Sequence, residues 1–489
     1  MSRPWTWIAP DAIPADLVDA GVRALAEELE LAPEFAPEVL ADAGEQARTP
    51  DLGAHEDLTD IPFVTIDPPG ARDLDQAMRL QRRGSGYSVH YAIADVAAFV
   101  RPGSPVDREA HHRGQTMYAP GRRFPLHPPP LSEQAASLLA GVDRPAYVWS
   151  IELDAAGEIT SVDLRRAVVR SQAQLTYEQV QTAHDAGNPV PSVALLGEIG
   201  PLLELAGQAR GASSLAIPDQ ELVRDEEGNY VLRYRPLLPA EDWNAQISLL
   251  TGMVAAGLML GAQVGILRTL PPPQDRTLSR FRRQAAALGT PWPADRQYGD
   301  FLRSLDPARP KQLALLHFSA TLFRGAGYTP FDGDVPEQAE QAAVGAPYAH
   351  TTAPLRRLVD RYVLAICHSI CTGERVPGWV RTELFELPTI MAESDRTARA
   401  VDRACVDMAE AMLLADRMQQ TFDAVVVDVP EDDEDDEDLS VQLADPAVLA
   451  PCSGDGELGQ QLRVRVAHAD PVARRVRLRV VGQDSGPTG

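Results

Sequence analysis

The chain has 489 residues, of which 44% are apolar and 6% aromatic, and 45 Lys and Arg side chains stand against 70 Asp and Glu. This length fits about three domains of ordinary size, each able to bury a core. The composition excludes a wholly disordered, collagen-like or disulfide-stapled protein. The four cysteines include no Cys-x-x-Cys pair, so neither a zinc ribbon nor a thioredoxin-type site is indicated, and a reducing compartment is favoured.

The formal net charge of -25 argues against a nucleic-acid partner if the charge is spread evenly over the surface. The charge is uneven, because residues 431–438 read EDDEDDED, a run that predicts a solvated loop. Lys311 is the single lysine, and every other basic side chain is an arginine. Any RNA-binding surface must therefore be local and built from arginines.

The first residues lack a basic segment followed by an unbroken apolar run, so we expect a cytoplasmic protein. Residues 249–267 reach membrane-spanning length without a charge. They contain four glycines together with Thr251 and Gln263, and no basic cluster flanks them. We therefore predict a buried core helix here and no membrane contact.

The order of sequence patterns predicts a multidomain α+β protein. Residues 1–58 place Leu, Val and Ala at three- and four-residue spacing behind Pro and Asp start signals. This pattern predicts a small helical module, such as a helix-turn-helix or a three-helix unit. Residues 59–392 open with alternating strands around a glycine-containing turn at residues 84–86, which predicts a hairpin leading into a mixed α/β domain. Residues 393–420 have the apolar stripe of one connecting amphipathic helix.

The last segment, residues 421–489, predicts a small five-stranded β-barrel, because short alternating strands are separated by turn-rich loops. The period of two in the last strand places three arginines on one face of the sheet, and two arginines of the preceding strand extend this basic strip. Its members are Arg463, Arg465, Arg475, Arg477 and Arg479. Such a strip is often only a solvated strand face, so by itself it is weak evidence for RNA.

The strongest local signal is an acidic segment at residues 65–77, where Asp67, Asp73 and Asp75 fall within nine residues. Crowded carboxylates repel each other unless cations neutralise them, and Mg²⁺ or Mn²⁺ prefers hard oxygen ligands of this kind. A Pro-Pro-Gly kink after Asp67 would let the loop fold back so that the oxygens converge. An acidic surface loop is the alternative, and spacing alone leaves both interpretations open.

A second signal is the segment 350–362, which predicts a helix that starts near Pro354 and carries Arg356 and Arg357 in its first turn. Arginine at a helix N-terminus opposes the helix dipole. The placement makes sense if this end faces a phosphate, which the free N–H groups and a planar guanidinium both favour. The alternative is a surface helix whose arginines pair with Asp360, which would contribute little energy.

Together these two segments resemble the ribonuclease II family, whose catalytic RNB domain carries an aspartate-rich loop of this form and a later arginine segment. Other stretches resemble the same family in the same order, among them VHYAIADVAAF, SQAQLTYEQV and GILRTLPPP. The resemblance extends from about residue 61 to residue 390. It implies a central RNB catalytic domain, and it implies that the terminal barrel is an OB-fold RNA-binding domain.

Carried over position by position, the resemblance implies the following site. The implied metal ligands are Asp67, Asp73, Asp75 and Gln76, and the implied catalytic residues are Asp73, Asp75 and Arg356. The implied RNA contacts are Tyr118, Tyr177, Gln246, Arg356 and Arg357. Gln76 stands where the family has a fourth aspartate, so we expect weaker metal affinity or an altered site. Gln246 stands where the family has a glutamate, and Ala353 and Leu358 replace its usual serine and tyrosine.

The implied activity is a processive, hydrolytic 3′ to 5′ exoribonuclease that releases nucleoside 5′-monophosphates with two Mg²⁺ ions, or Mn²⁺, and acts on single-stranded RNA as a monomer. The helical start is too short for the two cold-shock-type domains that usually precede this catalytic domain. We therefore expect easier access for structured RNA, such as a duplex with a 3′ overhang. A catalytically impaired RNA-binding relative is the alternative, favoured by Gln76. A carboxylate-pair glycosidase is a third and weaker hypothesis.

Overall fold

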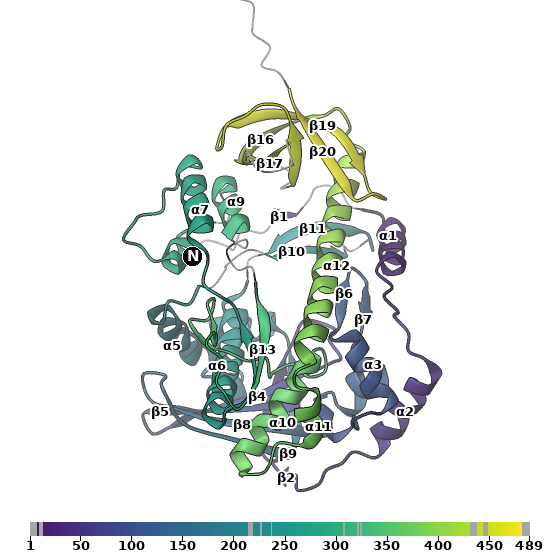
Figure 1. The fold of residues 1–489 in the computed structure, drawn as a ribbon, viewed down its shortest axis with the longest axis vertical. Coiled ribbons are helices and arrows are strands. Elements are labelled where there is room, and N and C mark those ends of the chain that lie inside the picture. Colours follow the sequence, from purple (N-terminus) through teal and green to yellow (C-terminus); the bar gives the residue numbers. More distant parts are fainter. Residues whose placement is uncertain are drawn as a thin grey trace, which may run out of the picture.

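The computed structural model describes residues 7–8, 13–213, 219–224, 227–235, 237–306, 309–319, 322, 325–430, 438–443 and 448–481. A central mixed domain and a C-terminal barrel lie at opposite ends of the molecule (Figure 1). One long helix, α12 (Leu387–Ala415), runs between them. The predicted connecting helix is thus present, although it begins six residues before residue 393 and ends five residues before residue 420.

The central sheet has six strands in the order β2-β9-β3-β4-β5-β8. The strands are β2 (Glu56–Asp57), β3 (Phe63–Ile66), β4 (Gln76–Arg83), β5 (Gly86–Ala94), β8 (Asp143–Leu153) and β9 (Ile159–Leu175). The predicted hairpin is confirmed, since Arg83 pairs with Gly86 across a two-residue turn in which Gly84 has a φ of 59°. Such a turn needs a residue that tolerates positive φ. Tyr91 and Trp149 are fully buried in the core beside this sheet.

Helices pack around the sheet and position the loops at its ends. They are α3 (Pro105–Arg113), α4 (Tyr177–Asp185), α5 (Leu196–Ala209), α6 (Pro239–Ala262), α10 (Leu358–Thr372) and α11 (Gly378–Glu383). By length and composition α6 could cross a membrane. One side of it is buried instead, where Ile247, Leu250 and Met259 join the same core as α10. The predicted core helix is confirmed, and the rest of the apolar run forms β12 (Val264–Thr269).

The two predicted N-terminal helices are α1 (Ala15–Glu28) and α2 (Pro37–Arg48). Val18 of α1 packs in a cluster with Met408 of α12, whereas Val39 of α2 packs in a cluster with Val106 of α3. The helices therefore lie apart along one side of the molecule (Figure 1), and the expected helix-turn-helix is wrong. The physical reason is that each apolar stripe finds its own partner on the larger domain.

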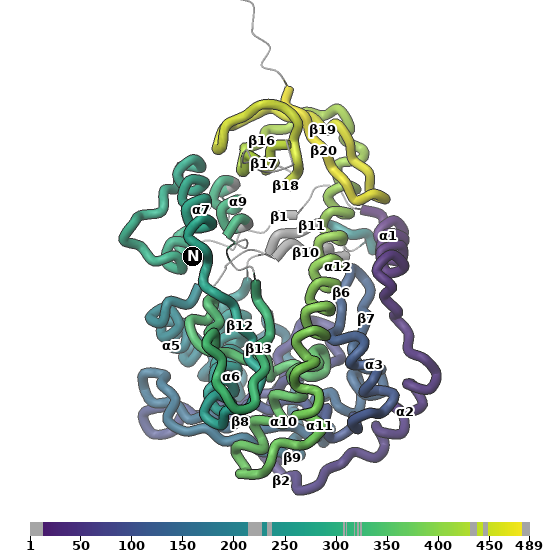
Figure 2. The backbone as a smooth tube through the Cα atoms, in the orientation of Figure 1, coloured from purple at the N-terminus to yellow at the C-terminus, as the bar shows by residue number. Residues whose placement is uncertain are grey.

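The predicted C-terminal barrel is confirmed as a closed barrel of five strands in the order β16-β17-β18-β20-β19. The strands are β16 (Thr421–Asp428), β17 (Leu439–Leu443), β18 (Leu449–Ser453), β19 (Gln461–Asp470) and β20 (Arg475–Val480). Val426, Val464 and Leu478 fill its core. The tube in Figure 2 shows α12 running up to this barrel. Of the acidic run, only Asp438 lies among the described residues.

The remaining elements are short sheets and a helical group. The strands are β1 (Trp7–Ile8), β6 (Met117–Ala119), β7 (Arg122–Phe124), β10 (Asp219–Arg224), β11 (Tyr230–Arg235), β13 (Gly327–Asp332), β14 (Glu340–Gln341) and β15 (Ala346–Pro347). The helices are α7 (Asp275–Ala287), α8 (Tyr298–Arg303) and α9 (Pro310–Ser319), with single turns at Val96–Ala98, Leu131–Ala135 and Pro191–Val193. The α7–α9 group lies beside the barrel (Figure 1).

Candidate active site

The acidic loop, residues 67–75, joins β3 to β4 at one edge of the central sheet. Ser137 fixes its course, because the serine Oγ accepts a hydrogen bond from Leu74 N at 3.0 Å and donates one to Arg72 O at 2.7 Å. Gly70 has a φ of 82°, which a residue without a Cβ adopts at little cost. The loop therefore folds back at its kink, as the Pro-Pro-Gly sequence predicted.

Asp75, at the end of the loop, contacts the arginine segment predicted from the distant part of the chain. Its Oδ1 accepts a hydrogen bond from Leu355 N at 2.7 Å, and its Oδ2 lies 3.3 Å from Arg356 Nε. Asp75 is only 4% exposed, and burial raises its pKa to about 7 against the opposing influence of Arg356. The two predicted segments thus meet at a buried carboxylate.

Asp67 and Asp73 lie close enough to influence each other electrostatically. Burial raises the pKa of Asp67 to about 6, and Asp73 adds to the rise. The Oδ2 atom of Asp67 is buried without a hydrogen-bond partner. Asp73 is instead bound by Arg123, whose Nη1 lies 2.5 Å from Asp73 Oδ1. The loop therefore contains buried negative charge that is only partly compensated.

The donor chemistry of this loop fits a divalent cation. Within the described part of the chain, no group of three or more His, Cys, Asp or Glu side chains is already arranged around a common point for a metal. The orphaned Asp67 Oδ2 and the raised pKa values of Asp67 and Asp75 nonetheless show carboxylates that lack enough positive charge. Hard oxygen donors of this kind suit Mg²⁺ or Mn²⁺. The residues that would hold such an ion are Asp67, Asp73 and Asp75.

Gln76, predicted as a fourth metal ligand, has both ends of its amide bound to protein atoms. Its Oε1 accepts a hydrogen bond from Tyr91 OH at 2.5 Å, and its Nε2 donates one to Thr352 O at 2.7 Å. The first bond ties the start of β4 to β5, and the second ties it to the segment that carries Arg356. Gln76 therefore positions that segment in this structure, and an aspartate could not donate the second bond.

The arginine segment differs from its predicted form, because α10 begins at Leu358 rather than near Pro354. Both arginines therefore precede the helix. Asp360 Oδ1 accepts a hydrogen bond from Ala353 N at 2.7 Å, and its two oxygens pair with Arg357 at 2.9 Å each. Burial alone would lower the pKa of Arg357, yet Asp360 raises it above its usual value. Arg357 holds the turn, and only Arg356 faces the acidic loop.

Tyr118 lies beside the acidic loop because its strand is joined to the arginine segment. Thr116 N donates a hydrogen bond to Arg356 O at 2.9 Å, and Tyr118 follows two residues later in β6. The Tyr118 hydroxyl donates to Asp73 Oδ2 at 3.4 Å, while 49% of the residue is exposed. Burial of the hydroxyl end, together with Asp73, raises the pKa of Tyr118 to about 12. Its ring is thus available beside the loop, as predicted.

Tyr177 and Gln246 were both predicted to contact RNA, and the structure separates them. Burial, with the negative charge of Asp67 adding to it, raises the pKa of Tyr177 to about 12. Asn244 Nδ2 donates to that hydroxyl at 3.4 Å. Gln246 instead lines a cavity of about 210 Å³ with Arg210. Residues two apart on a helix point to different sides.

Asn244 and Ser248 are the polar residues of α6 that face the site, and the sequence reasoning missed both. Ser248 Oγ lies 2.8 Å from Thr352 Oγ1, so it also contacts the arginine segment. Asn244 and Ser248 are four residues apart and share one face of α6. That spacing is the signal that could have identified them.

Comparison with known families confirms the class of protein. The model of the RNB domain matches residues 55–373, and the model of the RNase II-type exonuclease C-terminal S1 domain matches residues 420–481. The chain therefore belongs to the RNB-domain family and ends in an S1-type domain of the OB-fold architecture.

Curated relatives match most of this chain and a smaller part of their own length. The Exosome complex exonuclease RRP44 homolog A of Arabidopsis thaliana is 28% identical over 362 residues, which cover 71% of this chain and 37% of that protein. Ribonuclease R of Escherichia coli (strain K12) is 28% identical over 399 residues, which cover 76% of this chain and 48% of that protein. The chain thus spans half or less of the length of these two relatives.

Solved structures share the fold. The apo form of RNase R from Mycoplasma genitalium has a TM-score of 0.82 at 20% identity and covers 95% of this chain and 78% of its own. Yeast Ssd1, described as a pseudonuclease, has a TM-score of 0.71 at 16% identity and covers 95% of this chain and 58% of its own. At these identities the likeness shows the fold alone.

Proposed function

We propose that this protein is a hydrolytic, processive 3′ to 5′ exoribonuclease that degrades RNA to nucleoside 5′-monophosphates. The observation that carries the proposal is the contact between Arg356 and Asp75, which places a guanidinium beside the acidic loop. The RNB-domain match and the names of the relatives support the same activity.

The proposed reaction is the attack of water on the phosphorus of the last phosphodiester. The bond from phosphorus to the 3′ oxygen of the preceding nucleotide breaks, this oxygen takes up a proton, and a nucleoside 5′-monophosphate is released. The Arg356 guanidinium would clamp the phosphate through charge-assisted hydrogen bonds, which strengthen as negative charge builds up. Tyr118 would stack on the terminal base, a contact worth about 1–3 kcal/mol that tolerates any base.

Ribonucleases with an RNB domain depend on divalent metal ions. We place two Mg²⁺ ions, or Mn²⁺, at Asp67, Asp73 and Asp75. When bound, such ions supply a nucleophilic water and neutralise charge on the attacking and leaving oxygens. Because residue 76 is a glutamine, the site has one carboxylate fewer than the family resemblance implies, and the Gln76 amide already binds Tyr91 and Thr352. We therefore expect weaker metal affinity.

The proposed substrate is single-stranded RNA of any sequence, and a duplex with a 3′ overhang is a further one. RNase R of M. genitalium has been solved with single-stranded and with double-stranded RNA. Degradation of an overhang duplex tests this proposal, and stalling many nucleotides before the duplex would contradict it. We further propose a cytoplasmic monomer, which light scattering and cell fractionation would test.

A second candidate function is RNA binding without cleavage. It is favoured by the engagement of Gln76 with protein atoms and by the structural likeness to a pseudonuclease. Incubation of 5′-labelled single-stranded RNA with Mg²⁺ or Mn²⁺ separates the two candidates. A ladder that collapses to a short end product supports the exoribonuclease, and binding without shortening supports the alternative. The family match gives no support to the glycosidase hypothesis.

A further inference from the structure

Among the described residues of the barrel, the outward face of β19 and β20 is the most cationic surface. Val464, Val466 and Leu478 point into the barrel core and are fully buried. The exposed residues on the outward face are predominantly basic and comprise Arg463, Arg465, His468, Arg475, Arg477 and Arg479. The half-buried Asp470 lies opposite Arg475 on the same face. The basic strip expected from the alternating pattern is therefore present on one face of a two-stranded surface.

Arg465 and Arg479 lie directly opposite each other across the two strands. Like charges in this arrangement destabilise a sheet. Neither arginine has an ion-pair partner within the described residues. Two neighbouring arginines do have one: Arg463 Nε lies 3.4 Å from Asp423 Oδ1, and Arg477 Nη2 lies 3.3 Å from Asp438 Oδ2. A bound polyanion would relieve this repulsion. The register therefore indicates an anionic ligand more strongly than the exposed strip alone.

The face that OB folds conventionally use for nucleic acid, on strands two and three, has a different character here. The described residues that alternate with the core residues of β17 and β18 are Ser440, Gln442, Leu449, Pro451 and Ser453, none of them cationic or aromatic. Of the acidic run 431–438 between β16 and β17, the described residue is Asp438, and it pairs with Arg477 of β20.

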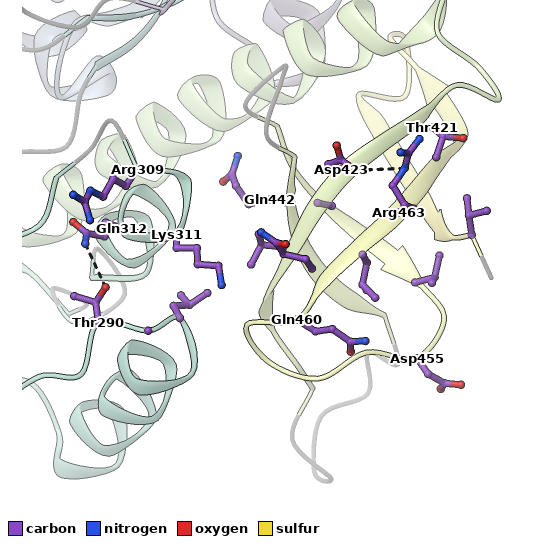
Figure 3. Close-up of a pocket in the computed structure, with 18 residues that line it drawn as sticks. Thr290, Arg309, Lys311, Gln312, Thr421, Asp423, Gln442, Asp455, Gln460 and Arg463 are labelled. Atoms are coloured by element: carbon purple, nitrogen blue, oxygen red, sulfur yellow. Dashed lines mark hydrogen bonds and ion pairs between the residues drawn. The ribbon is translucent and has the colours of Figure 1, made fainter. Parts of the chain in front are cut away.

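The cationic face continues into a cavity of about 1230 Å³ between the barrel and the α7–α9 group. Arg463 lies on the barrel wall of this cavity, and Arg309 and Lys311 lie on the opposite wall (Figure 3). Asp423 and Asp455 also line it. The cavity therefore has cations on both sides, although its lining is not uniformly basic.

Gln442 gives this cavity a feature suited to a nucleotide. The side chain lines the cavity and the residue is only 2% exposed. Its Oε1 atom is buried without a hydrogen-bond partner. A buried acceptor left unpaired costs free energy, and a base N–H or a ribose hydroxyl would satisfy it.

We propose that an RNA strand reaches the barrel across the outward face of β19 and β20, with phosphates on Arg465 and Arg479 and one nucleotide at Gln442. The strand then continues toward the catalytic loop. The assignment places the phosphate contacts of this barrel on β19 and β20, and Gln442 of β17 supplies the nucleotide contact. What happens to the RNA after it has bound to the barrel rests on the proposed function.

The binding test uses the full chain with Asp75→Asn as background, so that the RNA stays intact. The double variant Arg465→Ala/Arg479→Ala is compared with Arg165→Ala/Arg170→Ala, which removes the same charge from exposed positions of β9. We expect the first pair to weaken binding of an RNA of about 20 nucleotides at least tenfold. The slope of log affinity against log salt should fall in magnitude by about 1.4, at roughly 0.7 for each lost phosphate contact. The control pair should change neither quantity, and an equal affinity and slope for the first pair would overturn the assignment.

A short substrate separates this inference from the proposed function. Asp395 of α12 lies near the site, where its Oδ1 accepts a hydrogen bond from Gln115 Nε2 at 3.2 Å. From Asp395 to the barrel end of α12 the helix is about 30 Å long. A trinucleotide in the site therefore ends before the barrel. With Asp75 intact, the double variant should keep wild-type kcat and KM on a trinucleotide and raise KM on the longer RNA. Failure of the wild type to shorten any RNA would refute the proposed function, whereas wild-type kinetics of the double variant on long RNA would refute this inference alone.

Two further measurements bear on the ligand. Gln442→Leu should weaken binding of the longer RNA without changing the salt slope, because it removes an uncharged contact. An unchanged affinity in a variant with wild-type Tm would contradict the nucleotide assignment.

Vesicles of phosphatidylcholine with phosphatidylserine serve as the competing anionic surface. Vesicle binding that Arg465→Ala/Arg479→Ala abolishes, while RNA binding persists, would assign the face to lipid and overturn the proposal.

Discussion

Arg356 Nε lies 3.3 Å from Asp75 Oδ2, and this contact joins two segments that are far apart in the sequence. Leu355, the neighbour of Arg356, reinforces it by donating its backbone N–H to the other oxygen of Asp75 at 2.7 Å. The acidic loop and the arginine segment are therefore one structural unit. Predictions for single residues follow from the part that each plays in it.

Asp75→Asn is expected to abolish turnover while RNA binding persists. The amide can still accept the hydrogen bond from Leu355 N, so the local structure should remain, but the charge needed for divalent ions is gone. Single-turnover cleavage and fluorescence anisotropy with the same RNA measure the two properties. Normal cleavage by the variant would show that the assigned ligand set is wrong.

Arg356→Ala is expected to lower kcat by about 10²–10³, the usual effect of losing one donor to a developing negative charge. Its Tm should stay close to that of the wild type, because the Arg356 side chain is 44% exposed. Arg357→Ala is the matched neighbour and should behave in the opposite way. Loss of its pairing with buried Asp360 should cost about 3–5 kcal/mol of stability. Equal effects of the two variants on kcat at equal Tm would contradict the division of roles.

Gln76→Glu is expected to reduce both stability and activity. The carboxylate would face Thr352 O in place of the amide that now donates to it at 2.7 Å, and losing such a bond typically costs about 1–3 kcal/mol. Urea unfolding and the Mg²⁺ dependence of cleavage measure the effect. Gln76→Asp is the companion variant. If either substitution raised the apparent Mg²⁺ affinity without loss of stability, the positioning role of Gln76 would be disproved.

Because of His127, the free energy of unfolding should decrease as the pH falls below about 6.5. Burial, with Arg361 adding to it, lowers the pKa of His127 to about 3, whereas the unfolded chain binds a proton near the ordinary value. Between these two values the unfolded state holds more protons, so the free energy of unfolding falls by up to about 1.4 kcal/mol for each pH unit lost. His127→Asn cannot titrate, and its unfolding free energy should depend less steeply on pH over this range. Parallel pH profiles for the two proteins would contradict the assignment.

The local features of the fold and site were predictable because short sequence patterns encode them. Asp67, Asp73 and Asp75 share one loop, so their proximity follows from the kink between them. Alternation of period two identified most strands of the barrel. Alternation alone does not predict β18, because Pro451 argues against a strand, although β18 pairs with β17 on one side and with β20 on the other.

Features that depend on tertiary register were not predictable in the same way. Gln76 binds Tyr91 because the two are diagonal neighbours across β4 and β5, where Gln76 pairs with Ile93. A shift of two positions along α6 separates Gln246 from the face that carries Asn244. The apolar stripe of α1 predicted a helix, but nothing in that stripe identifies α12 as its partner. Each of these features is decided by packing between distant segments.

The most direct test of the central claim is to identify the products formed from a 5′-labelled single-stranded RNA in the presence of Mg²⁺. If the loop of Asp67, Asp73 and Asp75 acts with Arg356 on the 3′ end, chromatography will show nucleoside 5′-monophosphates accumulating from the first time points beside a single short labelled remnant. Full-length RNA that stays bound and intact, or internal fragments that carry 3′-phosphates, would contradict the account.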